Sequence, residues 1–219
     1  MPQITVVSAG RAEAEAAVAA ARTAFDTTDW PRNASLRARA LNELADRLAE
    51  RVPAMGRALA QENGKLLQQT TWEVSLSVDW LRYSAASALT QIAGRAGEPQ
   101  PGVHFHSTPE AMGVAGIIAP WNSPVILLVR DLGPAIGAGC TAVVKPPGQT
   151  GLTNALFAEA VAATTYLKHL AHRHSDEIGL LLVDKFVSFD ITDDPDPRSP
   201  NCTGVVTKRT RPSPSSCPT

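Results

Sequence analysis

Two short polar segments of this sequence follow apolar runs and carry side chains that can take part in chemistry. Asn122 lies in PWNSP, directly after the apolar run 112–119, and Lys145 opens KPPG at the end of the run 141–145. An asparagine amide can donate a hydrogen bond to a developing oxyanion. A lysine ammonium can hold the hydroxyl or phosphate oxygens of a nucleotide. Taken alone the pattern is weak, because many α/β proteins carry an Asn and a Lys in such places.

The surrounding elements decide whether these two side chains meet. The runs 112–119 and 141–145 are typical of short buried strands. Between them Ser123 and Pro124 favour the start of a helix, which glycines at 137–139 should end. Strands joined by a helix of this length predict a right-handed βαβ crossover in a parallel sheet. Ligands bind beyond the carboxyl ends of such strands, so we expect Asn122 and Lys145 on one rim.

Helices are predicted on both sides of this unit. Before it, Ser8 can cap a helix that ends near Phe25, and Ser35 can cap the next one. Pro53 and Gly64 suit the start and stop of a short helix, and a longer helix should cover 72–92. After it, Thr150 or Thr153 should cap a helix to about residue 163. Pro134 should kink or shorten the helix that contains it. We expect the helices before the unit to serve packing and to carry no chemistry.

Composition excludes several classes of protein. The 219 residues carry a net charge of −1, with 44% hydrophobic and 19% charged residues, as in an ordinary globular protein. Nothing therefore predicts a nucleic acid or membrane partner, and no secretory signal opens the sequence. The three cysteines have no metal-binding spacing and fit a reducing compartment. We expect a cytoplasmic protein without a metal site. His169, His172 and His174 fit a solvated helix end better than a zinc site.

The segment GVAGIIAPWNSPVILLVRDLGPAIGAGCTAVVKP resembles the first βαβ unit of the aldehyde dehydrogenase superfamily. ENGK at 62–65 and the residues RYS at 82–84 resemble the helices that precede it, and the resemblance extends to about Thr164. It implies that Asn122 is the oxyanion donor and that Lys145 contacts the adenosine ribose. It further implies a cofactor pocket lined by Ile117, Ile118, Ala119, Pro120 and Trp121. The family usually has an acid where this chain has Gly148, so NAD and NADP both remain open as cofactor, with mild favour for NADP.

The resemblance implies an α/β fold, made of N-terminal helices and the first βαβ unit of an incomplete Rossmann-like parallel sheet. The expected divisions are a helical lead-in at 1–97, an edge strand at 98–110 and the start of the nucleotide-binding domain at 111–164. The tail 165–219 is unmatched and largely irregular, and its Pro-, Ser- and Thr-rich composition predicts disorder from residue 195.

Three family segments are missing from the 219 residues: the Gly-Gln-x-Cys nucleophile, the Glu-Leu-Gly-Gly base and a Gly-Ser-Thr cofactor loop. Cys140 begins a buried strand, and Cys202 and Cys217 lie in the tail, so none can substitute. A matched helix that runs into a biased tail suggests a truncated or frameshifted product.

The resemblance thus implies an oxidoreductase that converts an aldehyde to a carboxylic acid with NAD or NADP, inactive as this chain alone. The alternative is a non-catalytic fragment that binds nucleotide weakly or associates with a full-length homologue. A homo-oligomer also stays open.

Overall fold

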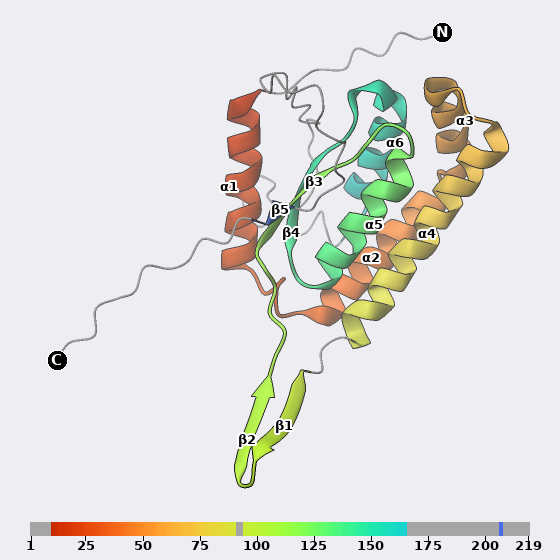
Figure 1. The fold of residues 1–219 in the computed structure, drawn as a ribbon. Coiled ribbons are helices and arrows are strands. Elements are labelled where there is room, and N and C mark those ends of the chain that lie inside the picture. Colours follow the sequence, from red (N-terminus) through yellow and green to blue (C-terminus); the bar gives the residue numbers. More distant parts are fainter. Residues whose placement is uncertain (1–9, 91–93, 166–205, 208–219) are drawn as a thin grey trace, which may run out of the picture.

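The computed structural model describes residues 10–90, 94–165 and 206–207 (Figure 1). Its centre is the predicted βαβ unit. Strand β3 (Val114–Ile118) and strand β4 (Thr141–Lys145) run parallel and are connected by helix α5 (Pro124–Gly137). Ile118 lies opposite Lys145 in the register, so the two strands end side by side. The expected α/β fold with a parallel pair of strands is confirmed.

Helices cover both faces of this small sheet (Figure 1). Helix α1 (Arg11–Thr27) packs on one face and α5 on the other, with α2 (Ala34–Ala49) and α4 (Leu67–Thr90) packed against α5. Helices α3 (Val52–Asn63) and α6 (Gly151–Ala162) pack against each other.

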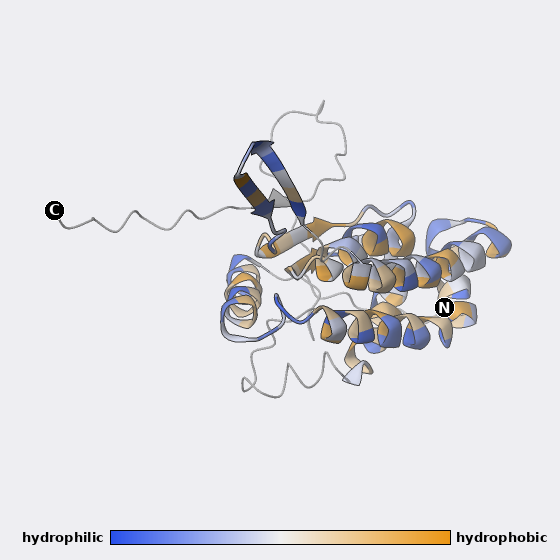
Figure 2. Ribbon diagram, turned by 90° about the horizontal axis from the view of Figure 1, so that it is seen from below, coloured by the Kyte–Doolittle hydropathy of each residue, from blue (hydrophilic) through white to orange (hydrophobic). Residues whose placement is uncertain are grey.

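One hydrophobic core holds these elements together. Its largest fully buried side chains come from α2, α3, α4, α5, β3 and the turn after α1; they are Trp30, Leu41, Leu44, Leu48, Met55, Leu59, Val74, Leu81, Ile117, Val129 and Leu132. In Figure 2 the apolar parts of the helices turn toward one another, and the polar parts turn outward. The helices before the sheet therefore do serve packing, as the sequence indicated.

Several helix ends differ from the predictions, beginning with α1, whose N-cap is Gly10 and not Ser8. Helix α2 is capped by Asn33, whose Oδ1 accepts from the Leu36 backbone N–H at 3.0 Å, and not by Ser35. An Asn at this position satisfies a free N–H of the first turn as well as a Ser would. Helix α4 begins at Leu67, earlier than predicted. Gly64 ends α3 with φ of 70°, as expected of a C-terminal glycine.

Helix α5 tolerates a proline that was expected to disturb it. Pro134 lies inside the helix, which continues to Gly137 and is followed by Gly139 with φ of 96°. The helix is therefore not shortened. The small Gly133 lets α5 approach α4 closely, because a Cβ at this position would come within 2.4 Å of the Ser84 Oγ.

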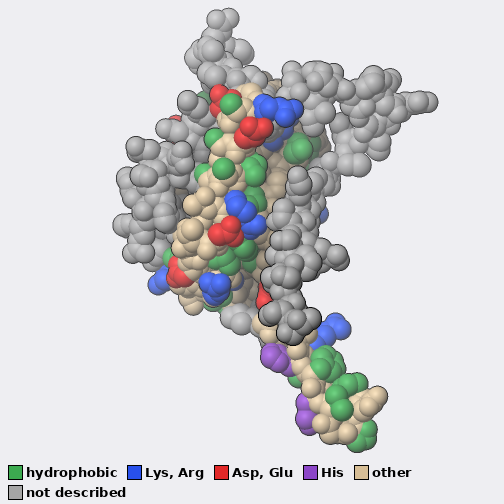
Figure 3. Space-filling view, turned by 90° about the vertical axis from the view of Figure 1, so that its left-hand side faces the viewer, with side chains coloured by type: hydrophobic (Ala, Val, Ile, Leu, Met, Phe, Trp, Pro, Cys, Tyr) green, Lys and Arg blue, Asp and Glu red, His purple; other side chains and the backbone are tan. Residues whose placement is uncertain are grey.

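The segment expected as one edge strand at 98–110 is instead a hairpin. Strand β1 (Arg95–Gln100) pairs antiparallel with β2 (Val103–Ser107), and the two form a sheet of their own. The turn uses Pro101 and Gly102, whose φ of 80° suits a glycine. Figure 3 shows the hairpin projecting from the body, with exposed histidine and apolar side chains. His104 and His106 are exposed, as expected.

After Thr165 the structure describes only strand β5 (Val206–Thr207), which pairs antiparallel with β3. The prediction of disorder from residue 195 otherwise falls outside the described residues. None of the described helices is both long and apolar enough to cross a membrane.

Candidate cofactor and oxyanion site

The carboxyl ends of β3 and β4 bring the two predicted segments to one rim. The Ala119 N–H donates to the Lys145 carbonyl at 3.0 Å, one step beyond the Ile118–Lys145 pair. Beyond this hydrogen bond, the chain turns at Trp121–Ser123 after β3 and at Pro146–Gly148 after β4. Asn122, which follows β3, and Lys145, which ends β4, therefore both lie at the carboxyl ends of the two neighbouring strands.

Asn122 lies on an exposed turn directly before helix α5. Its amide makes no hydrogen bond within the described part of the chain, so it is available to a ligand. The N-terminus of α5 adds a partial positive charge beside it, which favours a negatively charged group. An amide donor and a helix N-terminus together suit an oxyanion.

The predicted pocket residues before Asn122 differ in exposure. Trp121 is 50% exposed and Ile118 is 42% exposed, so both side chains can contact a bound molecule. Ile117 and Ala119 are 1% and 4% exposed and belong to the core, so they can reach a ligand only through the backbone. Pro120 is half-buried.

Lys145 and Gly148 form the second half of the rim. Lys145 is half-buried and ends β4, and Gly148 is exposed in the short 3₁₀ turn η1 (Gly148–Thr150). A Cβ built on Gly148 would meet no atom within 4 Å. The position thus has open space in front of it and no charge of its own.

Helix α6 is capped by a carboxylate from another helix. Glu62, near the end of α3, accepts from the Leu152 N–H at 2.6 Å, the Thr153 N–H at 3.1 Å and the Thr153 hydroxyl at 2.7 Å. Thr150 occupies the N-cap position, as one of the two predicted caps, but its hydroxyl bonds to Asn154 and Pro147 and caps no N–H of the helix. Thr153 lies in the first turn of the helix and donates to Glu62. The Glu62 carboxylate fixes the helix that follows the Lys145 turn.

We expect Glu62→Ala to destabilise the fold by about 2–3 kcal/mol, because the partly buried backbone N–H groups of Leu152 and Thr153 lose a charged acceptor. Thermal unfolding should then shift down by roughly 5–10 °C. Glu50→Ala removes an exposed carboxylate from α2 and should change stability by less than about 1 kcal/mol. Equal effects of the two substitutions would contradict the capping role.

The loop between α3 and α4 contacts the Asn122 turn from the other side. Asn63 Nδ2 donates to the Trp121 carbonyl at 2.8 Å, and Lys65 Nζ lies 3.0 Å from both the Ser123 Oγ and the Glu73 Oε2. The sequence analysis missed these residues because it assigned the preceding helices to packing alone. Ser123 occupies the cap position of α5, but its hydroxyl caps no N–H of the helix.

The segment ENGK at 62–65 was the available signal. Asn63 and Lys65 of this segment bond to the Trp121–Ser123 turn, and Glu62 bonds to the first turn of α6.

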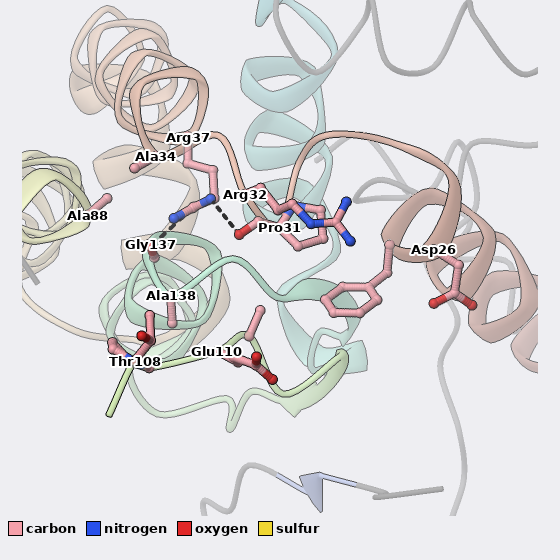
Figure 4. A pocket seen from close by; sticks show the side chains of 13 residues that line it. Asp26, Pro31, Arg32, Ala34, Arg37, Ala88, Thr108, Glu110, Gly137 and Ala138 are labelled. Atoms are coloured by element: carbon pink, nitrogen blue, oxygen red, sulfur yellow. Dashed lines mark hydrogen bonds between the residues drawn. The ribbon is translucent and has the colours of Figure 1, made fainter. Parts of the chain in front are cut away.

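A hollow of about 590 Å³ lies at the other end of the strands from the rim (Figure 4). It is bordered by the ends of α1 and α5 and by the segment before β3, with Asp26, Arg32, Arg37 and Glu110 as its charged residues. Arg37 is committed to the carbonyls of Trp30, Pro31 and Gly137. The hollow lies at the amino ends of the strands, so it is no part of the predicted rim.

Other reactive side chains do not reach the rim. Cys140 is buried and precedes β4, at the amino end of that strand. Cys202, Cys217 and the three histidines at 169–174 lie outside the described residues. Within the described ranges, no group of His, Cys, Asp and Glu could hold a metal ion.

Comparisons with known proteins identify the family of this chain. The sequence model of the aldehyde dehydrogenase family matches residues 2–172, somewhat beyond the predicted end near Thr164. The 2-aminomuconic semialdehyde dehydrogenase of Homo sapiens is 35% identical over 150 residues, which are 68% of this chain and 30% of that protein.

Two solved structures show the same relation. The NAD-dependent aldehyde dehydrogenase from Sinorhizobium meliloti has a TM-score of 0.66 and 31% identity, over 79% of this chain and 33% of its own. An NADP-dependent enzyme from E. coli has a TM-score of 0.66 and 28% identity, over 79% of this chain and 34% of its own.

The parallel strands, covered by helices on both faces, define an α/β protein. The family match covers most of the sequence, and the chain belongs to the aldehyde dehydrogenase family. It spans about a third of the length of the relatives it matches.

Proposed function

We propose that this chain provides the oxyanion donor and part of the cofactor site of an enzyme that oxidises an aldehyde to a carboxylic acid with NAD or NADP. One observation carries the proposal: the Ala119–Lys145 hydrogen bond joins the two strand ends from which Asn122 and Lys145 emerge. Family membership supports assigning this rim to the cofactor and the aldehyde oxygen.

In this proposal each residue has a limited task. The Asn122 amide donates to the oxygen of the aldehyde as negative charge develops there, and the α5 N-terminus assists it. The Lys145 ammonium holds ribose hydroxyls, and the exposed faces of Trp121 and Ile118 contact the cofactor. The bound cofactor supplies a hydride acceptor.

Oxidation also needs a thiolate to attack the aldehyde and a base to activate water. The 219 residues contain neither family segment that supplies these groups. We therefore propose that this polypeptide alone is inactive. We also propose that the change after Thr164 reflects a frameshift. Reading the other two frames of the coding DNA tests this: nucleophile and base segments should be found there, and their absence would refute the frameshift.

Fluorescence titration with each cofactor tests the proposed site. Trp121 is half-exposed on the rim, so saturable quenching by NAD+ or NADP+ is expected, and Trp121→Phe should remove most of it. Quenching that survives in Trp121→Phe, or no saturable quenching at all, would contradict the cofactor site.

Gly148 provides a test of cofactor choice. Gly148→Glu should weaken NADP+ binding roughly tenfold (about 1.4 kcal/mol) and spare NAD+, because a carboxylate there would repel a 2′-phosphate. Gly148→Gln has the same shape without the charge and is the matched control. Dissociation constants for both cofactors decide the matter, and equal effects of Glu and Gln would show that charge at this position has no role.

A second candidate function is association with a full-length homologue. Trp72 and Tyr83 on α4 are 65% and 62% exposed, which favours contact with another polypeptide. Sedimentation of a mixture with a full-length relative would show co-migration, and loss of it in Trp72→Ser/Tyr83→Ser, if this function holds. Independent migration of the two chains would exclude it.

A further inference from the structure

We propose that Asn63 and the Lys65–Glu73 ion pair are positioning residues, which hold the Trp121–Ser123 turn and so aim the Asn122 amide. The inference rests on the proposed role of Asn122 and assigns the support of that role to the loop between α3 and α4.

The contacts fall on both flanks of Asn122. On one side Asn63 Nδ2 donates to the Trp121 carbonyl at 2.8 Å. On the other side Lys65 Nζ donates to the Ser123 Oγ at 3.0 Å. Asn122 makes no hydrogen bond of its own within the described residues, so its orientation depends on how these neighbours are held.

The Lys65 ammonium is itself fixed by a buried charge. Its Nζ lies 3.0 Å from Glu73 Oε2, and the Glu73 side chain is only 5% exposed. A carboxylate this buried needs a paired cation nearby, so the ammonium cannot leave without a large penalty. Lysine has three N–H donors, and two of them serve Glu73 and Ser123. Helix α4 thus holds Lys65, and Lys65 holds the turn.

The arrangement is not optimal for stability. Glu73 Oε1 and Asn63 Oδ1 are both buried without a hydrogen-bond partner in the described structure. Buried unsatisfied acceptors are uncommon, and each requires a reason. The reason we infer is the fixed turn, because an oxyanion donor acts best when it is preorganised.

The test measures the motion of the turn in the full 219-residue chain labelled with ¹⁵N-asparagine. Asn122→Asp assigns the Asn122 backbone signal, and Asn154, buried and bonded to the Pro147 carbonyl, is the internal reference. The order parameter of Asn122 should fall from about 0.85 to below about 0.6 in Ser123→Ala and in Lys65→Met/Glu73→Gln. Asn63→Ala should act in the same direction.

Two further variants separate positioning from general stability. Arg82→Met changes the same helix as Glu73, where it removes an exposed ion pair between Arg82 and Asp46 of α2. It should leave the Asn122 order parameter unchanged. Lys65→Arg keeps the positive charge, so the Asn122 order parameter should stay close to its value in the unchanged chain. An unchanged Asn122 order parameter in Ser123→Ala and in the double variant would overturn the proposal, even if their melting temperatures fall. The readout needs no cofactor, so failure of the proposed cofactor site would be seen separately, in the titrations.

Discussion

Purified alone, the 219-residue chain is expected to oxidise no simple aldehyde with either NAD+ or NADP+. The rim is proposed to supply an oxyanion donor and cofactor contacts, but the sequence contains no Gly-Gln-x-Cys or Glu-Leu-Gly-Gly segment. Loss of a catalytic nucleophile lowers kcat by about 10⁶ in a well-studied hydrolase, where binding groups alone leave little activity. Cys140 cannot replace it, because its side chain is buried at the amino end of β4.

The measurement is the absorbance of reduced cofactor over a range of small aliphatic and aromatic aldehydes. An aldehyde dehydrogenase of full family length, assayed in parallel, controls for the substrates and the cofactor. Turnover by this chain would contradict the prediction, and turnover that persists in Cys140→Ser would show that the nucleophile is a residue other than Cys140.

Replacing Arg37 on α2 should cause a large loss of stability. Its guanidinium donates to the carbonyls of Trp30 at 2.8 Å, Pro31 at 3.0 Å and Gly137 at 3.2 Å. The residue is 6% exposed, and its burial lowers the pKa of the guanidinium. The Arg37 side chain thus connects the turn after α1 to the end of α5 (Figure 4). Trp30 Nε1 makes a further connection, because it donates to the Cys140 carbonyl at 3.1 Å.

Arg37→Met would leave these carbonyls without their donor in a buried place. We expect a loss of about 3–5 kcal/mol in the free energy of unfolding and a shift of roughly 10 °C in Tm. Arg82→Met is the matched control, because it removes an exposed arginine paired with Asp46 and should cost less than about 1 kcal/mol. Chemical denaturation of both variants measures the difference. If Arg37→Met is no worse than Arg82→Met, Arg37 does not hold the two segments together.

The sequence alone predicted the elements that depend on short local patterns of residues. Apolar runs predicted β3 and β4, and a glycine in the left-handed region ended α3 at Gly64. The rim followed from these elements, because the carboxyl ends of parallel strands lie together.

Contacts between distant segments could not be predicted in this way. Lys65 and Ser123 are 58 residues apart, and Glu62 and Leu152 are 90 apart. The local pattern around Thr150 and Thr153 offers two ordinary caps, and only the packing of α3 against α6 brings Glu62 to that helix. The hairpin was missed for a different reason: Arg95–Gln100 contains Gly97 and Pro99, which disfavour a strand unless a partner pairs with it.

The most direct test of the proposed site is a map of where cofactor binds. Backbone ¹H–¹⁵N spectra of the labelled chain, recorded during titration with NAD+ to roughly millimolar concentration, report every perturbed residue that has a backbone N–H. The proposed site requires saturable shifts confined to Ile118–Ser123 and Lys145–Thr150, and weaker binding in Lys145→Met. Shifts clustered instead around Phe25, Arg32 and Glu110, or no saturable shift at all, would contradict it.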